Sequence, residues 1–203
     1  MARLYFIRHG ETDWNREGRL QGRTDTSLNA HGRRQAASVG KHLVDLVGAE
    51  GAERFASIPF YASPLLRTRQ TIEILRESAG LDPADYQPEE RLREIGFGAW
   101  EGKTWPEVRS RDPIGARDRD KDRWRFVPPG GESYANVLER VQPWFDTVQQ
   151  DTCVVAHGGV ARVMMVLCGG LTPEQALEAD IWQGKVLLFE EGEMRWLPKP
   201  GHG

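Results

Sequence analysis

The sequence predicts an α/β protein, a three-layer α/β/α sandwich with a mostly parallel central sheet. Short apolar stretches of strand length alternate along the chain with longer stretches whose apolar residues recur at helical spacing. Strands that alternate with helices form a mostly parallel sheet covered by helices on both faces. The 203 residues contain no internal repeat and no clear linker, so we expect residues 1–203 to form a single domain.

The first half of the chain contains two predicted strands, each followed by a helix. Residues 3–7 form a short apolar strand that stops at Arg8-His9-Gly10. Apolar spacing predicts a helix over residues 29–47, with Asn29 as its N-cap. Residues 60–62 form the second strand. Ser63 and Pro64 are expected to cap and open a helix that ends near residue 79.

The second half is predicted to continue this alternation. We expect a helix from Tyr134 to about Gln150, a strand over residues 152–156, and a helix from Gly158 to about Cys168. Residues 186–189 and 194–197 flank a polar run and predict a closing β-hairpin. Residues 109–125 mix charges of both signs, and we consider two interpretations: a solvated, irregular insertion or a lid over a binding site.

Composition and charge exclude several classes of protein. No apolar run approaches the roughly 20 residues of a membrane-spanning helix, and the apolar stretch near the N-terminus is too short for a signal peptide. We therefore expect a cytoplasmic protein without a membrane partner. The formal net charge of −3 argues against a nucleic-acid partner. Cys153 and Cys168 are expected to be reduced core residues.

The polar segments that could carry chemistry each follow a predicted strand. Arg8-His9-Gly10 follows the first strand, Ser63-Pro64 follows the second, and His157-Gly158-Gly159 follows a third. In open α/β sheets, ligands bind beyond the carboxyl ends of the strands. We therefore expect these three segments to meet in one site.

Their residue types are suited to phosphoryl transfer. The planar guanidinium of arginine makes paired hydrogen bonds to phosphate oxygens and stays charged. Neutral imidazole is available as a nucleophile near pH 7. His9 directly follows Arg8, Gly10 is expected to let the backbone approach the phosphate closely, and Asn15 is a further neutral donor.

Five segments of the sequence together resemble the histidine phosphatase superfamily, also called the phosphoglycerate mutase-like family. They fall in the family's order at residues 8–15 (Arg-His-Gly-Glu-Thr-x-x-Asn), 63–71 (Ser-Pro-Leu-Leu-Arg-Thr-Arg-Gln-Thr), 92–102 (Leu-Arg-Glu-Ile-Gly-Phe-Gly-Ala-Trp-Glu-Gly), 129–133 (Pro-Gly-Gly-Glu-Ser) and 156–159 (Ala-His-Gly-Gly). The resemblance extends over nearly the whole chain. It implies the phosphoglycerate mutase-like fold.

The resemblance also implies roles for individual residues. His9 is the nucleophile that forms a phosphohistidine. Arg8 and Arg67 are the phosphate clamp, and Arg69, which lies two residues further on a different face of the helix, is the competing choice.

Two further roles complete the predicted catalytic set. Glu94 matches the general acid. It is set among apolar residues that would raise its pKa by desolvation, whereas Glu101 is expected to be a surface carboxylate. His157 would stabilise the charge on the transferring oxygens.

The remaining candidates are expected to bind the substrate or its phosphate group. They are Asn15, Gln21, Gly22 and Gly158, together with Arg8, Arg67 and His157. The backbone N–H of Gly158 lies at the start of a helix, where anions bind. The histidines show no metal-ligand spacing, and two arginines with a protonatable histidine already supply positive charge, so we expect no metal and no cofactor.

Three functions compete at this stage. The first is a phosphatase that hydrolyses small phosphorylated metabolites, with water resolving phospho-His9. The second is a 2,3-bisphosphoglycerate-dependent phosphoglycerate mutase, in which that bisphosphate is the cofactor. The third is a phospho-ligand binding protein without turnover. The phosphatase is favoured because residues 97–102 have the phosphatase-like form, which resembles α-ribazole and broad-specificity phosphatases. The insertion at residues 105–128 is expected to select the substrate, and either a monomer or a homodimer is compatible with the sequence.

Overall fold

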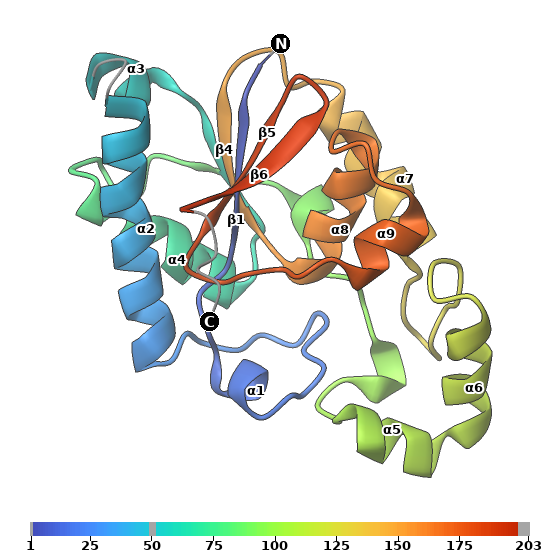
Figure 1. The fold of residues 1–203 in the computed structure, drawn as a ribbon. Coiled ribbons are helices and arrows are strands. Elements are labelled where there is room, and N and C mark those ends of the chain that lie inside the picture. The colour runs from blue at the N-terminus through green and yellow to red at the C-terminus, as the bar shows by residue number, and fades with distance from the viewer. Residues whose placement is uncertain (1, 49–51, 199–203) are drawn as a thin grey trace.

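The computed structural model describes residues 2–48 and 52–198, and a six-stranded sheet lies at its centre (Figure 1). The strands in spatial order are β3 (Gln87–Pro88), β2 (Phe60–Ala62), β4 (Thr152–Ala156), β1 (Leu4–Arg8), β5 (Val186–Glu190) and β6 (Glu193–Leu197). The first four are parallel to one another, whereas β5 is antiparallel to both β1 and β6. The mostly parallel sheet and the closing hairpin are confirmed.

Helices cover both faces of this sheet, as the sequence predicts (Figure 1). One face carries α2 (Ala30–Gly48), α3 (Ala52–Ser57) and α4 (Leu66–Ser78), and the other carries α7 (Tyr134–Phe145), α8 (Gly158–Leu167) and α9 (Pro173–Glu178). Strand β1 shows why both faces need covering. Tyr5 and Ile7 pack in the core on the side of α2 and α4, and Leu4 and Phe6 pack in the core on the side of α7 and α8. A strand buried on both faces must be apolar throughout.

Two of the predicted helix ends are wrong and one is right. Asn29 caps α2, because its Oδ1 accepts a hydrogen bond from the N–H of Gly32 at 2.9 Å. Helix α4 begins at Leu66 rather than at Pro64, and Ser63 does not cap it. Helix α7 ends at Phe145 rather than near residue 150. There the Thr147 hydroxyl donates to the carbonyl of Trp144 at 2.6 Å and competes with the helical pattern.

The charged insertion is helical, so the expectation of an irregular segment is wrong. It forms α5 (Trp105–Arg111) and α6 (Pro113–Lys121), which project from the lower right of the sandwich in Figure 1. Asp112 joins them: its Oδ1 accepts from Gly115 N at 2.9 Å, and its Oδ2 accepts from the indole of Trp100 at 3.0 Å. Trp100, Val108 and Ala116 form a small core of their own beneath the two helices.

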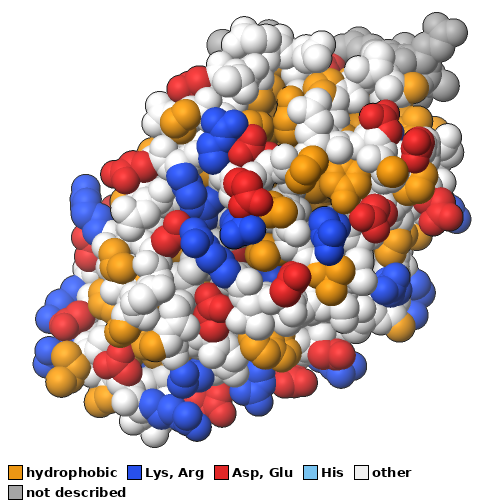
Figure 2. Space-filling view, turned by 180° about the vertical axis from the view of Figure 1, so that it is seen from behind, with side chains coloured by type: hydrophobic (Ala, Val, Ile, Leu, Met, Phe, Trp, Pro, Cys, Tyr) orange, Lys and Arg blue, Asp and Glu red, His pale blue; other side chains and the backbone are white. Residues whose placement is uncertain are grey.

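The rest of the described chain consists of loops and short turns. Helix α1 (Asp13–Arg16) and two 3-10 turns (Glu90–Leu92 and Gly98–Trp100) lie near the site. On the face shown in Figure 2, acidic and basic side chains are interspersed. None of the helices in the described ranges is long and apolar enough to cross a membrane. Cys153 and Cys168 are both free thiols, as expected.

Candidate functional site

A cavity of about 310 Å³ lies beyond the carboxyl ends of β1 and β4, and most of the predicted site residues meet there. The predicted residues that line it are Arg8, His9, Asn15, Gln21, Gly22, Arg67, Glu94 and Gly158. They come from segments more than 140 residues apart in the sequence, which the parallel pairing of β1 with β4 brings together.

His9 lies directly after β1, where its backbone N–H donates to the carbonyl of Ala156 at 3.0 Å. Its ring Nδ1 is 2.8 Å from the carbonyl oxygen of Gly10. Because a carbonyl only accepts, Nδ1 carries the proton and Nε2 keeps its lone pair. Burial, then the charges of Arg67 and Arg8, lower the pKa of His9 well below its usual value. The ring is therefore neutral and nucleophilic at pH 7.

Half-buried Arg8 and buried Arg67 place positive charge beside His9. Each guanidinium is held by backbone carbonyls: Arg8 donates to Ile181 O at 2.8 Å, and Arg67 donates to Gly22 O at 2.8 Å and Thr24 O at 2.9 Å. Burial lowers the pKa of both arginines. The Nε atoms of both are buried without a partner within the described chain. These unsatisfied donors are suited to an anion.

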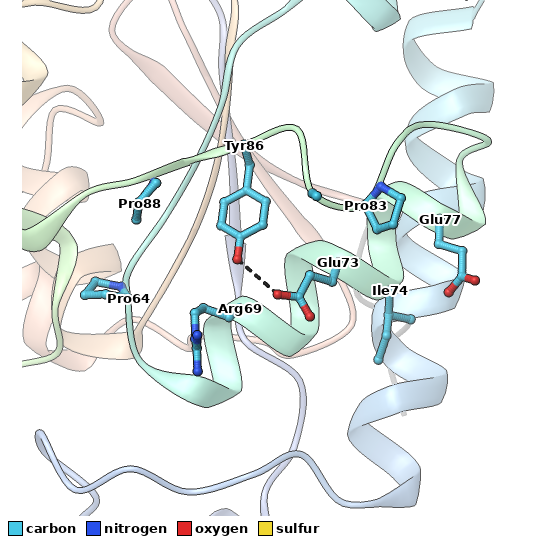
Figure 3. A pocket seen from close by; sticks show the side chains of 9 residues that line it. Pro64, Arg69, Glu73, Ile74, Glu77, Pro83, Tyr86 and Pro88 are labelled. Atoms are coloured by element: carbon cyan, nitrogen blue, oxygen red, sulfur yellow. Dashed lines mark hydrogen bonds between the residues drawn. The ribbon is translucent and has the colours of Figure 1, made fainter.

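The choice between Arg67 and Arg69 is decided by the geometry of α4. Arg67 is fully buried beside His9, whereas Arg69 lines a separate groove on the outer side of the helix with Glu73 and Tyr86 (Figure 3). In that groove the Tyr86 hydroxyl donates to Glu73 at 3.0 Å, and burial raises the pKa of Tyr86 to about 12. Of the two, Arg67 shares the cavity of His9 and Arg69 does not.

Glu94 lies in the same cavity as the two arginines. Its Oε1 accepts hydrogen bonds from Ile95 N at 3.0 Å and Gly159 N at 2.9 Å. Burial raises the pKa of Glu94, although Arg67, these backbone donors and Arg8 act in the opposite direction. A carboxyl group whose pKa is raised is suited to donate a proton near neutral pH.

His157 lies behind His9 and is not part of the cavity lining. Its ring centroid is 5.3 Å from that of His9, and its Nε2 is 2.8 Å from the hydroxyl of Ser63. Its Nδ1 is buried without a partner in the part of the chain described here. Burial, then the charge of Arg67, lowers the pKa of His157 well below its usual value. His157 is therefore neutral near pH 7, and the positive charge of the site comes from the arginines.

Asn15 is oriented by its neighbours. Its Oδ1 accepts from Thr12 N at 3.2 Å, from the Thr12 hydroxyl at 3.1 Å and from Gln183 Nε2 at 3.1 Å. The amide NH₂ group is thus left to donate into the cavity. Gln21 is fixed similarly, because its Oε1 accepts from the hydroxyls of Thr12 and Thr26.

Two glycines of the site are required for reasons of packing. A Cβ on Gly10 would lie 2.4 Å from the backbone oxygen of Gly32, so close contact with α2 explains this glycine. We expected Gly10 to let the backbone approach a phosphate group. The contact with Gly32 gives a different reason for this glycine and does not test that expectation. Gly22 has a φ of +52°, and a Cβ there would meet the carboxylate of Glu101 at 2.0 Å.

Sequence analysis missed several residues that build the site. Gln183 donates to the carbonyl of His9 at 3.0 Å as well as to Asn15, yet it lies in a stretch without periodicity. Ser63 was expected to cap a helix and instead contacts His157. The cavity is also lined by Arg19, Phe97, Trp105, Arg119, Arg123, Tyr134, Arg162 and Ile181. Three of these, Trp105, Arg119 and Arg123, come from the insertion at residues 105–128.

The described residues include no group of three or more histidine, cysteine, aspartate or glutamate side chains that could hold a metal ion. The site instead combines two arginines, two neutral histidines and a carboxyl group with a raised pKa. Such an arrangement can bind a phosphate group, attack it with a ring nitrogen and protonate a leaving oxygen.

Comparison with known proteins gives consistent relatives. The histidine phosphatase superfamily (branch 1) matches residues 4–198. The glucosyl-3-phosphoglycerate phosphatase of Mycolicibacterium vanbaalenii is 33% identical over all of this chain and 85% of its own length. The human 6-phosphofructo-2-kinase/fructose-2,6-bisphosphatase 4 is 29% identical over 80% of this chain, which spans only 32% of that larger protein.

The fold also matches solved structures. A putative α-ribazole-5′-P phosphatase from Escherichia coli superposes with a TM-score of 0.77 over 96% of this chain and 94% of its own. At 23% sequence identity, this likeness concerns the fold alone.

Proposed function

Because the chain belongs to the histidine phosphatase superfamily and is a phosphomonoesterase of that family, we propose that it hydrolyses small phosphate monoesters through a phosphohistidine on His9. The observation that carries this proposal is the state of His9. Its ring is buried and neutral, Nδ1 donates to Gly10 O, and Nε2 has no hydrogen-bond partner among the described residues, within the field of buried Arg67 and half-buried Arg8.

In the first step, Nε2 of His9 attacks the phosphorus atom and forms a P–N bond as the P–O bond to the leaving group breaks. Arg8, Arg67 and the amide of Asn15 hold the phosphate oxygens. Glu94 is the general acid and gives its proton to the leaving oxygen. The raised pKa of Glu94 keeps that proton available at higher pH than an ordinary carboxyl group would.

In the second step, Glu94, now ionised, takes a proton from water. The resulting hydroxide attacks phospho-His9, the P–N bond breaks, and inorganic phosphate and neutral His9 are released. His157 can donate from Nδ1 to a phosphate oxygen while Nε2 accepts the hydroxyl proton of Ser63. The N–H of Gly158 at the start of α8 is a further donor.

We propose that this chemistry requires neither a metal ion nor a cofactor. Arg8 and Arg67 supply the fixed positive charge that a metal ion supplies in other phosphoryl-transfer sites. Turnover of p-nitrophenyl phosphate is therefore expected to continue in EDTA. A loss of turnover in EDTA that Mg²⁺ restores would contradict this part of the proposal.

The substitution His9→Ala tests the nucleophile. Phosphate release from p-nitrophenyl phosphate should fall roughly a thousandfold or more, and an acid-labile, alkali-stable phosphate should form on the wild type alone. His31→Ala is the matched control, because His31 is exposed on α2 and outside the cavity. Near-normal turnover by His9→Ala would refute the proposal.

The same preparation distinguishes hydrolysis from isomerisation. With 3-phosphoglycerate and catalytic 2,3-bisphosphoglycerate, a phosphatase releases inorganic phosphate, whereas a mutase accumulates 2-phosphoglycerate with little phosphate release. We expect phosphate release. Substrates named for the relatives, glucosyl-3-phosphoglycerate and fructose 2,6-bisphosphate, belong in the same panel.

A further inference from the structure

The cavity carries more positive charge than one phosphate group requires. Six arginines of the described chain line it against a single carboxyl group, Glu94. They are Arg8, Arg19, Arg67, Arg119, Arg123 and Arg162. A phosphate monoester has a charge of about −2 near pH 7, which Arg8 and Arg67 already balance. The remaining arginines need another explanation.

Three of them, Arg119, Arg123 and Arg162, line the cavity together with the half-buried Tyr134. Tyr134 begins α7 and is stacked on Trp124, with ring centroids 5.6 Å apart. Burial and the charge of Glu94 raise the pKa of Tyr134, while the charges of Arg162, Arg119 and Arg123 act to lower it. The three guanidinium groups therefore lie within electrostatic reach of the same phenol, although they come from α6, from the segment after it and from α8.

The positions of these three arginines are fixed by an aromatic ring of the cavity wall and by backbone carbonyls outside the cavity. Arg119 lies over the ring of Trp105, 4.1 Å from its centroid. Arg162 donates to the carbonyls of Ala176 and Ala179, and Arg123 donates to the carbonyl of Leu177. These contacts orient the guanidinium groups without neutralising them.

Acidic partners compensate this charge only in part. Arg119 is 3.5 Å from Asp120, its neighbour in the sequence, and Arg123 pairs with Glu178, whose side chain is 76% exposed. Pairs with exposed carboxylates are screened by solvent. Arg162 has no acidic partner within the described residues. The Nε atom of Arg123 is buried and has no hydrogen-bond partner among the same residues. Like charges in such a space repel each other until an anion binds among them.

We infer that Arg119, Arg123, Arg162 and the hydroxyl of Tyr134 form a second anion subsite in the same cavity as His9. The substrate is then a phosphate monoester that carries a second acidic group, a carboxylate or another phosphate. This inference rests on the proposed function, because it assumes that the first phosphate binds at His9. Substrate selection then depends on the insertion, which carries Arg119 and Arg123, and on the first turns of α8, which carry Arg162.

Matched substrates test this subsite. 3-Phosphoglycerate and glycerol 3-phosphate differ only in a carboxylate that replaces a hydroxymethyl group. Fructose 1,6-bisphosphate and fructose 6-phosphate differ only in a second phosphate. The wild type should prefer the more acidic member of at least one pair by about tenfold or more in kcat/KM, since a hydrogen bond to a charged group is worth at least that factor. The pair with the larger ratio identifies the second group.

Variants locate the preference in the subsite. Arg119→Gln and Arg123→Gln should each reduce the ratio of the preferred pair about tenfold. Arg117→Gln, an exposed arginine of the same helix that pairs with Asp118, should leave the ratio unchanged. A wild-type ratio near one in both pairs, or a ratio that survives in the double variant of Arg119 and Arg123, would overturn the inference.

A binding measurement separates the subsite from the catalytic proposal. The four compounds are titrated into His9→Ala by calorimetry, which requires no turnover. If the wild type hydrolyses none of them but His9→Ala binds the preferred compound at least tenfold more tightly than its partner, the proposed function fails and the subsite stands. Equal affinities within both pairs would refute the subsite even if hydrolysis were observed.

Discussion

Glu101 should control the position of Arg67, although the two side chains do not touch. The sequence suggested a surface carboxylate, and the structure shows a half-exposed Glu101 whose two oxygens are both engaged. One oxygen of Glu101 accepts hydrogen bonds from Arg23 N at 2.9 Å and Phe97 N at 3.2 Å. The other accepts from the backbone N–H of Thr24 at 3.1 Å and from its hydroxyl at 2.6 Å.

These four hydrogen bonds hold the loop that orients the clamp. The carbonyls of Gly22 and Thr24 accept from the two terminal nitrogens of Arg67. No carboxylate of the described chain forms an ion pair with Arg67 within 4.0 Å. Its guanidinium therefore depends on the loop for its orientation, and the loop depends on Glu101.

The substitution Glu101→Gln removes half of this support. An amide has one acceptor oxygen, so it can satisfy one pair of donors while its NH₂ group faces the other pair. Two hydrogen bonds to a charged group are lost, each worth about 1.5–3 kcal/mol. With a discount for the partial exposure of Glu101, we expect the free energy of unfolding to fall by about 2–3 kcal/mol. A clamp misplaced by about 1 Å should lower kcat/KM up to about a hundredfold.

The assay follows p-nitrophenyl phosphate hydrolysis, inhibition by inorganic phosphate and thermal unfolding in parallel. The inhibition constant for phosphate should rise with the loss of kcat/KM, because both report on Arg67. Glu139→Gln is the control, since Glu139 is exposed on α7. Wild-type phosphate affinity in a destabilised Glu101→Gln protein would refute the coupling to Arg67.

Three other changes have predictable outcomes. Burial raises the pKa of Glu94 in the folded state, so the stability contributed by its neutral form is complete below the unfolded pKa and is lost as pH rises; Glu94→Gln should therefore have a higher Tm than the wild type at pH 8 and a matching Tm near pH 4. Gly10→Ala should cost about 1–3 kcal/mol, measured by urea unfolding, because its Cβ would lie 2.4 Å from the backbone of Gly32. Asp112→Ala removes the N-cap of α6 and the acceptor of the Trp100 indole, and should cost about 2 kcal/mol in the same assay.

Each of these changes has a matched control or a contradicting result. Gly96→Ala controls for Gly10→Ala, because the nearest atoms to its Cβ are 3.7 Å away. Asp118→Ala controls for Asp112→Ala, since Asp118 lies in the middle of α6 and pairs with exposed side chains. If Glu94→Gln had a lower Tm than the wild type at pH 8, burial would not dominate the pKa of Glu94.

Local sequence signals were sufficient to predict the framework of this protein. Strand β4 was placed at its exact bounds, and β1 within one residue, because both are short apolar runs bounded by polar residues. The segments of His9, Ser63 and His157 were expected to meet because the carboxyl ends of neighbouring parallel strands must lie together, whereas Arg67 and Glu94 were assigned from the family resemblance. Ser63 was misassigned because a serine before a proline satisfies the local rules for a helix cap, and only the tertiary position of His157 gives it another partner.

Contacts between distant segments could not be predicted in this way. Glu101 resembles any acidic residue of a turn until the loop at residues 22–24 folds against it. The charged insertion looked irregular because each of its two helices has a single buried residue, Val108 in α5 and Ala116 in α6, and both pack against Trp100 from outside the segment. Gln183 has no neighbouring pattern at all. The roles of these residues follow from their tertiary contacts, which local sequence patterns do not encode.

The separate small core beneath α5 and α6 has a consequence for how this scaffold can diversify. Trp100, Val108 and Ala116 pack apart from the two large cores that hold the sheet. Residues 104–121 can therefore be exchanged as a cassette without disturbing the strands that carry His9 and His157, whereas Trp124 packs in one of the large cores and has to be kept. A transplanted cassette would bring its own anchoring contacts, centred on a residue that replaces Asp112, and would change which molecules reach an unchanged reaction centre.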